Sequence, residues 1–259
     1  MTDDVYLTSD GPIAQIVLNR PEKRNAVTFA VWQRLPELFA EFEQDPQLKV
    51  LVLRGAGDRA FSAGADISEF ETLRASSEGA QAYNAAAERA QTALASLAKP
   101  TIALIRGVCV GGGCGLALSC DIRFGDRSAV FAITPARLGL VYPVGVTKHL
   151  VDLVGPAQAK AMLYTGMKIN AERAYELGLV NDLFDDATLE VDTLAFAQTI
   201  AERAQYSVRS TKRIVNLISS GLADENDETV ALRDGAFDTE DYREGVRAFL
   251  EKRPAVFKG

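Results

Sequence analysis

Two glycine-rich loops hold the groups in this sequence that are best suited to chemistry, and those groups are backbone amides. Residues 61–67 have the sequence FSAGADI and residues 107–115 have the sequence GVCVGGGCG. Each loop follows a predicted strand and precedes a predicted helix, whose first N–H groups lack partners within the helix. Small residues let such a backbone come close to a ligand. Two amides aimed at one oxygen form an oxyanion hole, where each donor contributes about 3 kcal/mol as charge develops on a carbonyl.

Each loop also has simpler interpretations. The first loop is equally consistent with a tight turn from strand to helix in which Asp66 caps the helix. The second loop does not fit a dinucleotide-binding fingerprint, because the sixth position counted from Gly111 is Leu116 instead of glycine. It does not fit a phosphate-binding P-loop either, since no lysine is near.

The elements that must position these loops alternate along the first part of the chain. Strands are expected at 13–18, 50–53 and 101–105, and helices at 29–42, from about Asp66, and at 79–97. This alternation predicts an α/β fold. Helices then dominate, at 151–163, 171–177, 188–203, 208–222 and 234–250. We therefore predict a mixed core over residues 1–190 and a helical region over residues 191–259.

Composition and charge exclude several classes of protein. The 259 residues are 47% hydrophobic and 24% charged, as in a globular protein with one large core. A net charge of −7 argues against nucleic-acid binding, which needs a clustered basic surface. No apolar stretch reaches the roughly 20 residues that span a bilayer. The acidic start lacks the basic and apolar regions of a signal peptide. We expect a cytoplasmic protein with neither a nucleic-acid nor a membrane partner.

The cysteines and the single histidine do not form a metal site. Cys109, Cys114 and Cys120 lie in one short segment with a spacing unlike that of zinc sites, and His149 is far along the chain. We expect reduced thiols and no bound metal. His149 is expected on a helix surface or at a subunit contact.

The two loops belong to a longer series of motifs that resembles the crotonase (enoyl-CoA hydratase/isomerase) superfamily. The series spans nearly the whole chain in the family's order. Its members are residues 18–21 (LNRP), 25–26, 61–67, 111–114 (GGGC), 120–121, 174–180 (AYELGLV) and 249–254 (FLEKRP).

The resemblance implies a fold, an assembly and a substrate. The fold is an α/β spiral core of ββα units followed by a helical C-terminal trimerisation region, in homotrimers or dimers of trimers. The substrate is an acyl-CoA thioester, and no separate cofactor is implied because coenzyme A is part of that substrate. The amides of Ala65 and Gly112 form the oxyanion hole by this resemblance. The remaining substrate-binding or CoA-binding candidates are Arg24, Ala63, Gly64, Asp66, Ile67, Gly111 and Lys258. Arg24 is alternatively a solvated turn residue.

Two residues that the resemblance leads us to expect are absent. Hydratases of the family use two glutamates, because adding water needs both a base and an acid. The matching positions hold Gly115 and Ala136. The simple isomerases keep the second of these glutamates. Glu69 and Glu71 follow the first loop, and we interpret them as solvated helix residues, with a place at the pocket mouth as the alternative.

Residues 132–142 and 240–245 instead resemble the corresponding segments of methylmalonyl-CoA decarboxylase. Loss of carbon dioxide needs no base, and the enolate left behind suits an oxyanion hole. Tyr142 and Thr134 are the candidates to bind the departing group or return a proton, although Tyr142 is equally consistent with an aromatic wall of the acyl pocket. One difference is Ala65, where the decarboxylase has histidine. A decarboxylase-type lyase is therefore the favoured hypothesis. The alternatives are an enoyl-CoA hydratase/isomerase of fatty-acid metabolism and a non-catalytic acyl-CoA-binding subunit.

Overall fold

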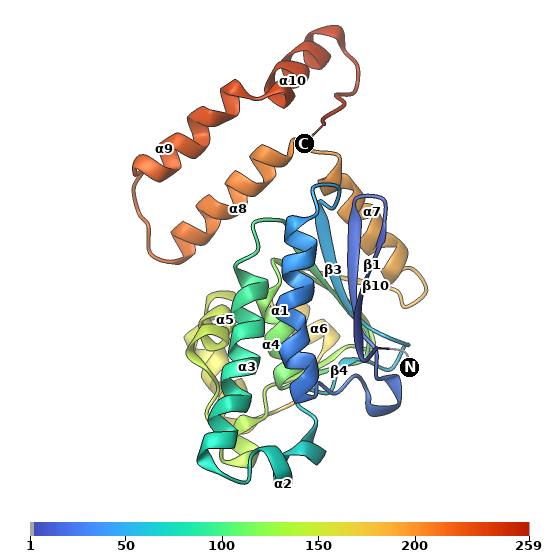
Figure 1. Cartoon of the computed structure of the whole chain (residues 1–259), viewed down its shortest axis with the longest axis vertical. Coiled ribbons are helices and arrows are strands. Elements are labelled where there is room, and N and C mark those ends of the chain that lie inside the picture. Colours follow the sequence, from blue (N-terminus) through green and yellow to red (C-terminus); the bar gives the residue numbers. More distant parts are fainter. Residues whose placement is uncertain (1–2, 259) are drawn as a thin grey trace.

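Two β-sheets form the framework of the fold, which a computed structural model describes for residues 3–258 (Figure 1). The larger sheet contains, in spatial order, β1 (Val5–Asp10), β2 (Ile13–Leu18), β3 (Val50–Gly55), β5 (Thr101–Ile105), β7 (Ile122–Asp126) and β10 (Asp182–Phe184). Strand β1 is antiparallel to β2, and the other neighbours are parallel. The smaller sheet contains β4 (Ala60–Ser62), β6 (Val108–Val110), β8 (Val130–Ala132) and β9 (Ile169–Asn170).

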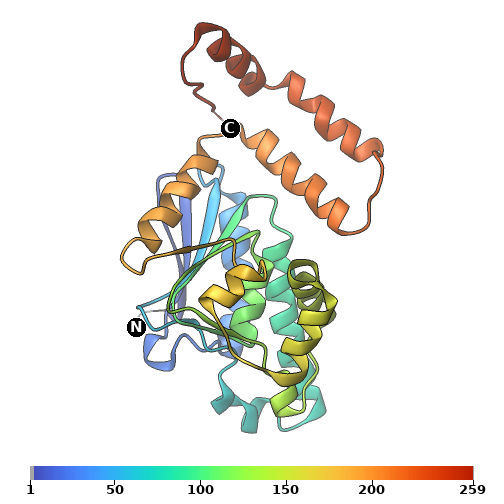
Figure 2. The same ribbon diagram turned by 180° about the vertical axis from the view of Figure 1, so that it is seen from behind.

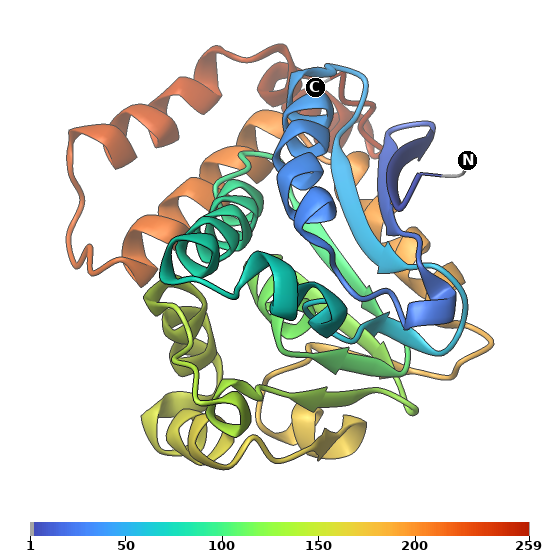
Figure 3. The same ribbon diagram turned by 60° about the horizontal axis from the view of Figure 1, so that its bottom comes forward.

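Successive strands alternate between the two sheets. Strands β3, β5 and β7 enter the larger sheet, and the next strand in each case, β4, β6 or β8, enters the smaller one. A helical segment follows each pair, through α3 (Ser77–Ala95), α4 (Gly112–Ser119) or α5 (Val144–Thr165), and α5 is followed by β9 of the smaller sheet instead of by another pair. These are the predicted ββα units. Figure 3 shows the short strands of the smaller sheet lying below the ends of the long ones.

Both faces of the larger sheet are covered, as expected for parallel strands without polar alternation. Along β3, Leu51 and Leu53 face one apolar cluster, which includes the buried side of α1 (Phe29–Gln44) and α3. Val50 and Val52 face the other cluster, with Leu189 and neighbouring residues of α7 (Leu189–Ala201). The alternation follows from the two-residue period of a strand.

The last three helices, α8 (Gln205–Ser219), α9 (Asp227–Asp234) and α10 (Glu240–Glu251), extend away from the core as an arm (Figures 1 and 2). Lys212 fastens α8 to the core, because its Nζ lies 2.8 Å from Asp121 Oδ2 and donates to the Lys99 carbonyl at 2.9 Å. The predicted boundary after residue 190 falls at the start of α7. Since α7 packs on the sheet, the projecting part begins with α8.

Most predicted elements agree with the structure, but the helix predicted at 234–250 begins later than expected, at Glu240. The chain there forms a 3₁₀ turn, Gly235–Asp238, and a new helix starts after Thr239. The Thr239 side chain accepts a hydrogen bond from the Tyr242 amide at 3.0 Å, which is the geometry of a helix N-cap. The sequence analysis also missed the three-residue strands of the smaller sheet, because so short a run carries no recognisable alternation. None of the helices in the described range is apolar over enough of its length to cross a bilayer.

Candidate active site

The two glycine-rich loops touch at Gly64. This residue is buried and has a φ of +90°, a conformation that favours glycine. A Cβ atom placed on it would lie 2.7 Å from the Val110 carbonyl oxygen and 3.1 Å from the Gly112 amide nitrogen. No side chain fits in that space. The first loop and the turn into α4 can therefore approach this closely only because residue 64 is glycine.

The Ala65 amide is left free by the way its neighbours pair with residue 27. The Val27 amide donates to the Gly64 carbonyl at 2.7 Å, and the Asp66 amide donates to the Val27 carbonyl at 3.0 Å. In such a parallel bridge the groups of the residue between the two bonds point the other way. The Ala65 N–H has no acceptor within residues 3–258, and the residue is half-buried.

The Gly112 amide is free for a different reason. Gly112 is the first residue of α4, so its N–H has no partner inside the helix. The preceding turn is held by the Gly111 amide, which donates to the Ala132 carbonyl at 2.9 Å. A Cβ on Gly112 would lie 3.7 Å from the Ala65 nitrogen, so the two unpaired amides are neighbours. Two such donors, one of them at the start of a helix, favour a developing negative charge.

A buried polar chain supports both amides from below. Trp32 of α1 packs under Gly112, because a Cβ there would be 2.9 Å from Trp32 Cζ2. The Trp32 indole donates to the Tyr83 hydroxyl at 3.1 Å, which donates in turn to the Val27 carbonyl at 3.1 Å. Burial raises the pKa of Tyr83 to about 12, so this hydroxyl stays neutral. The same Val27 carbonyl thus binds the first loop and the chain that supports the second.

The two nearest carboxylates of the first loop have structural roles. Asp66 accepts from the Ser68 hydroxyl at 2.7 Å and pairs with the Arg20 guanidinium at 2.8 Å. These contacts, the Ser68 hydrogen bond first, lower the pKa of Asp66. Glu69 accepts from the Phe29 amide at 2.8 Å, at the start of α1. Asp66 also accepts from the Ser68 amide at 3.1 Å, which agrees with its interpretation as a cap, while Glu69 differs from the solvated residue that we expected. Glu71 is exposed on α2 (Phe70–Leu73).

Tyr142 contacts the peptide unit that carries the Gly112 amide. Its hydroxyl donates to the Gly111 carbonyl at 3.0 Å. That carbonyl and the Gly112 N–H belong to one peptide, so the bond orients the peptide and polarises its N–H. Burial raises the pKa of Tyr142 well above its ordinary value, which keeps the phenol neutral. Thr134 lies beside the same turn, its Oγ1 3.8 Å from where a Gly111 Cβ would be.

The position of the missing first glutamate is filled by neutral polar groups. Gly115 is buried one helical turn after Gly112. A Cβ on it would lie 2.4 Å from Gln91 Nε2 and 2.9 Å from the Tyr142 hydroxyl. Ala136, at the second position, is exposed in the 3₁₀ turn Pro135–Leu138. The sequence analysis missed Gln91. Its position three residues before the buried Leu94 in α3 was the available signal.

The remaining candidates differ in how close they lie to these loops. Arg24 is exposed beside the first loop, where its carbonyl accepts from the Ala63 amide at 2.9 Å. Its side chain forms no ion pair with any described residue. Ile67 is 61% exposed at the end of the same loop. Lys258 lies against α10 of the arm, where its amide donates to Asp241 Oδ1 at 2.9 Å. His149 is half-buried on α5, and burial lowers its pKa.

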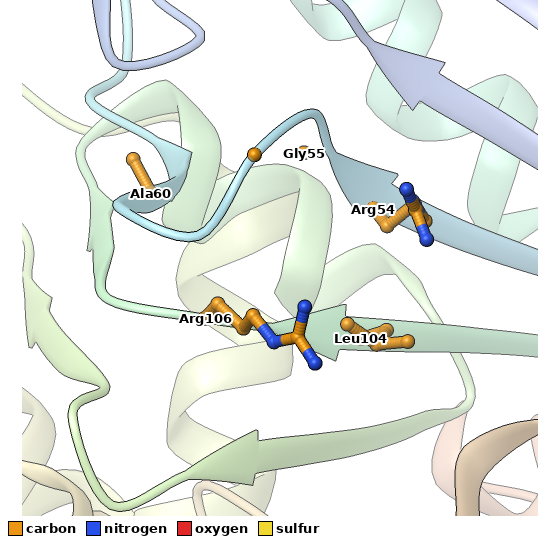
Figure 4. A pocket seen from close by; sticks show the side chains of 6 residues that line it. Arg54, Gly55, Ala60, Leu104 and Arg106 are labelled. Atoms are coloured by element: carbon orange, nitrogen blue, oxygen red, sulfur yellow. The ribbon is translucent and has the colours of Figure 1, made fainter. Parts of the chain in front are cut away.

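The charged side chains that line a small polar cavity, away from the two glycine-rich loops, already form ion pairs with neighbouring residues. It has a volume of about 10 Å³, enough for roughly one water molecule, and lies between the carboxyl ends of β3 and β5 (Figure 4). Its cations are Arg54 and Arg106. Arg54 pairs with Glu190 at 2.6 Å and Arg106 with Asp186 at 3.2 Å. The cavity therefore offers no unpaired charge to a ligand.

Comparison with known proteins gives one consistent result. The model of the enoyl-CoA hydratase/isomerase family matches residues 8–259. A crotonyl-CoA hydratase from Syntrophomonas wolfei is 33% identical over 259 residues, covering 98% of each chain. A carnitinyl-CoA dehydratase from Salmonella typhi is 33% identical over 269 residues and covers both chains fully. The crystal structure of an enoyl-CoA hydratase/isomerase family protein from Hyphomonas neptunium is 43% identical, with a TM-score of 0.96 over 100% of this chain and 98% of that one. The predicted crotonase-like α/β fold with a helical C-terminal region is thereby confirmed.

The contact at Gly64 leads to a prediction about stability. Gly64→Ala should lower the free energy of unfolding by about 3 kcal/mol, since alanine suffers both the positive φ and overlap with Val110. The control is Gly11→Ala, which has a φ of +53° but nothing within 4 Å of its Cβ, and it should cost only about 1 kcal/mol. Urea denaturation at equal protein concentration measures both. If Gly64→Ala and Gly11→Ala lowered the free energy of unfolding equally, the two loops would not be in contact.

Proposed function

The chain belongs to the enoyl-CoA hydratase/isomerase family and acts on acyl-CoA thioesters, and from this premise we propose that it forms and stabilises a thioester enolate between the amides of Ala65 and Gly112. The observation that supports this proposal is the pair of adjacent amides without acceptors in the described chain. A thioester oxygen between them accepts two hydrogen bonds. As the enolate forms, that oxygen gains negative charge, and each donor contributes about 3 kcal/mol.

For the reaction itself, we propose decarboxylation of a malonyl-type thioester. The bond between C2 and the carboxylate breaks, and its electron pair passes into the thioester to form the enolate. Carbon dioxide leaves, and C2 then takes one proton from water. No step requires a carboxylate base, which fits a site where Gln91 and Tyr142 fill the space next to Gly115. A glutamate there would also repel the substrate's carboxylate.

Hydration or isomerisation of an enoyl thioester is the second candidate. It is favoured by the relatives, which include a crotonyl-CoA hydratase and a carnitinyl-CoA dehydratase. It requires an acid and a base. With Gly115 and Ala136 at the two positions, and with Asp66 and Glu69 held in structural contacts, these groups would have to come from elsewhere.

The proposed coenzyme A site and the proposed assembly of subunits are linked. Arg24, exposed beside the first loop, is the cation for the coenzyme A phosphates. Lys258, whose amide donates to Asp241 Oδ1 of α10 at 2.9 Å, is proposed to serve such a site in another subunit. The arm exposes large apolar side chains, among them Phe249 at 84% and Leu250 at 75%. We propose that these side chains are covered in a homotrimer or a dimer of trimers.

The reaction is tested by supplying two substrates in parallel. We expect methylmalonyl-CoA to release carbon dioxide, and crotonyl-CoA to be hydrated at least about 100-fold more slowly than that, because glutamate is absent from both acid–base positions. Propionyl-CoA formation and the loss of enoyl absorbance measure the two rates. Faster turnover of crotonyl-CoA would favour the hydratase, and turnover of neither would favour a binding subunit.

Tyr142→Phe separates two roles of the phenol. If the hydroxyl only orients and polarises the Gly111–Gly112 peptide, kcat should fall about tenfold with KM nearly unchanged, the size of one hydrogen bond. If the hydroxyl instead donates a proton in the reaction, kcat should fall by a factor of about 10² to 10⁴. Steady-state kinetics distinguish these values, with Tyr164→Phe, an exposed tyrosine on α5, as the control. A fall of more than about 100-fold would contradict the orienting role.

The assembly is tested on the arm. Phe249→Ser with Leu250→Ser should convert the oligomer to monomers at micromolar concentration, because each buried apolar side chain contributes about 2 kcal/mol. Light scattering measures the mass. Val191→Ser, at an apolar position that is 67% exposed on α7, is the control and should leave the mass unchanged. A wild-type protein that is already monomeric would overturn the proposal.

A further inference from the structure

Gln91 is a buried polar residue whose side chain has no partner. It is 7% exposed, on the side of α3 that faces α4. Its carboxamide makes no hydrogen bond to any of residues 3–258. A carboxamide has two donors and one acceptor, and burying them unpaired costs free energy. The carboxamide atoms of Gln91 are not completely closed off from water, so they are open to water or to a ligand beside α4.

The polar groups around Gln91 already have partners of their own. The Gly115 amide donates to the Gly111 carbonyl at 3.0 Å, and the Gly115 carbonyl accepts from the Ser119 hydroxyl at 2.9 Å. The Tyr142 hydroxyl gives its proton to the Gly111 carbonyl. Gln91 Nε2 nevertheless lies only 2.4 Å from where a Gly115 Cβ would be. Its N–H groups therefore face the surface of α4 with no acceptor there.

The location of that surface relates Gln91 to the acyl chain. Gly112 and Gly115 are three residues apart, so they lie on one face of α4, about 5 Å apart along its axis. A thioester oxygen at the Gly112 amide places C1 of the acyl group at the start of this face. C3 lies two bonds beyond C1. If the acyl chain runs along α4, C3 is on the side where the Gln91 amide lies.

We propose that Gln91 is a specificity-determining residue whose N–H donates to an oxygen atom on C3 of the acyl group. The inference rests on the proposed function, because it takes the oxyanion hole as the anchor for C1. It assigns the substrate to C3-oxygenated acyl thioesters, a class that includes malonyl thioesters, in preference to plain alkyl ones. The N–H groups of a neutral carboxamide donate to a carbonyl or a carboxylate oxygen alike, whereas a glutamate carboxylate would repel both.

Two ligands that differ only at C3 test this assignment. Acetoacetyl-CoA and butyryl-CoA have the same number of carbons, and the first carries a carbonyl oxygen in place of two hydrogens. Calorimetry should show acetoacetyl-CoA binding about tenfold more tightly to the wild-type protein, the effect of one hydrogen bond. Gln91→Leu should bring the ratio of the two Kd values close to one by weakening acetoacetyl-CoA alone. Gln91→Glu should reverse the preference.

The controls separate this inference from the proposed function. Gln81→Leu changes an exposed glutamine on the same helix and should keep the wild-type ratio. Gln91→Leu should unfold at the same temperature as the wild type or a higher one, since no hydrogen bond within the chain is lost; Gln91→Met is the alternative if it does not fold. A ratio that Gln91→Leu leaves unchanged, as when Gln91 only holds a water molecule, overturns the assignment while the proposed function stands. Failure of the wild type to bind either thioester overturns both.

Discussion

The contact between Gly64 and the turn at residues 110–112 determines the rest of the site. At a φ of +90° and without a side chain, Gly64 lets two segments that are 46 residues apart share one surface. The bridge to Val27 then orients the first loop, since it uses the groups of Gly64 and Asp66 and leaves those of Ala65 unused. Because both free amides are backbone groups, their direction depends on peptide orientation rather than on a rotamer. The buried hydrogen bonds of Trp32 and Tyr83 therefore serve to hold peptide units in place.

Neutrality is the second property of the site, and it follows from what packs against α4. The groups beside Gly115, one helical turn after the free Gly112 amide, are a phenol and a carboxamide, and burial keeps the phenol protonated. The carboxylates of Asp66 and Glu69 are turned toward Arg20 and the start of α1. A developing oxyanion consequently meets donors without a competing negative charge. In such a site the electrostatic contribution is set before the substrate arrives, which is the condition under which oxyanion holes are most effective.

How much of this could be predicted from the sequence depends on how local each feature is. The strand at 101–105 agrees with β5 at both ends, and both glycine loops were located, because turns and buried strands leave local signals. The order of motifs along the chain predicted the fold. The contacts of Tyr142 with Gly111 and of Gln91 with Gly115 join segments 31 and 24 residues apart, and no local pattern encodes them. For the same reason Glu69 looked like a surface residue until its bond to the Phe29 amide was seen.

The absence of a side chain at residue 115 has to be understood together with the side chain at residue 91. A glycine alone would leave a void beside α4, and an empty space in a packed interior is unfavourable. Gln91 and Tyr142 fill that space, so the glycine at residue 115 and the two neutral side chains beside it form one packing unit. A glutamate at position 115 would require both side chains to move, and moving Tyr142 would remove one of the two hydrogen bonds that the Gly111 carbonyl accepts, the other being from the Gly115 amide, and so loosen the orientation of the Gly112 amide. The chemistry next to the oxyanion hole is thus coupled to the hole itself, through a single peptide and the two helices that pack against it.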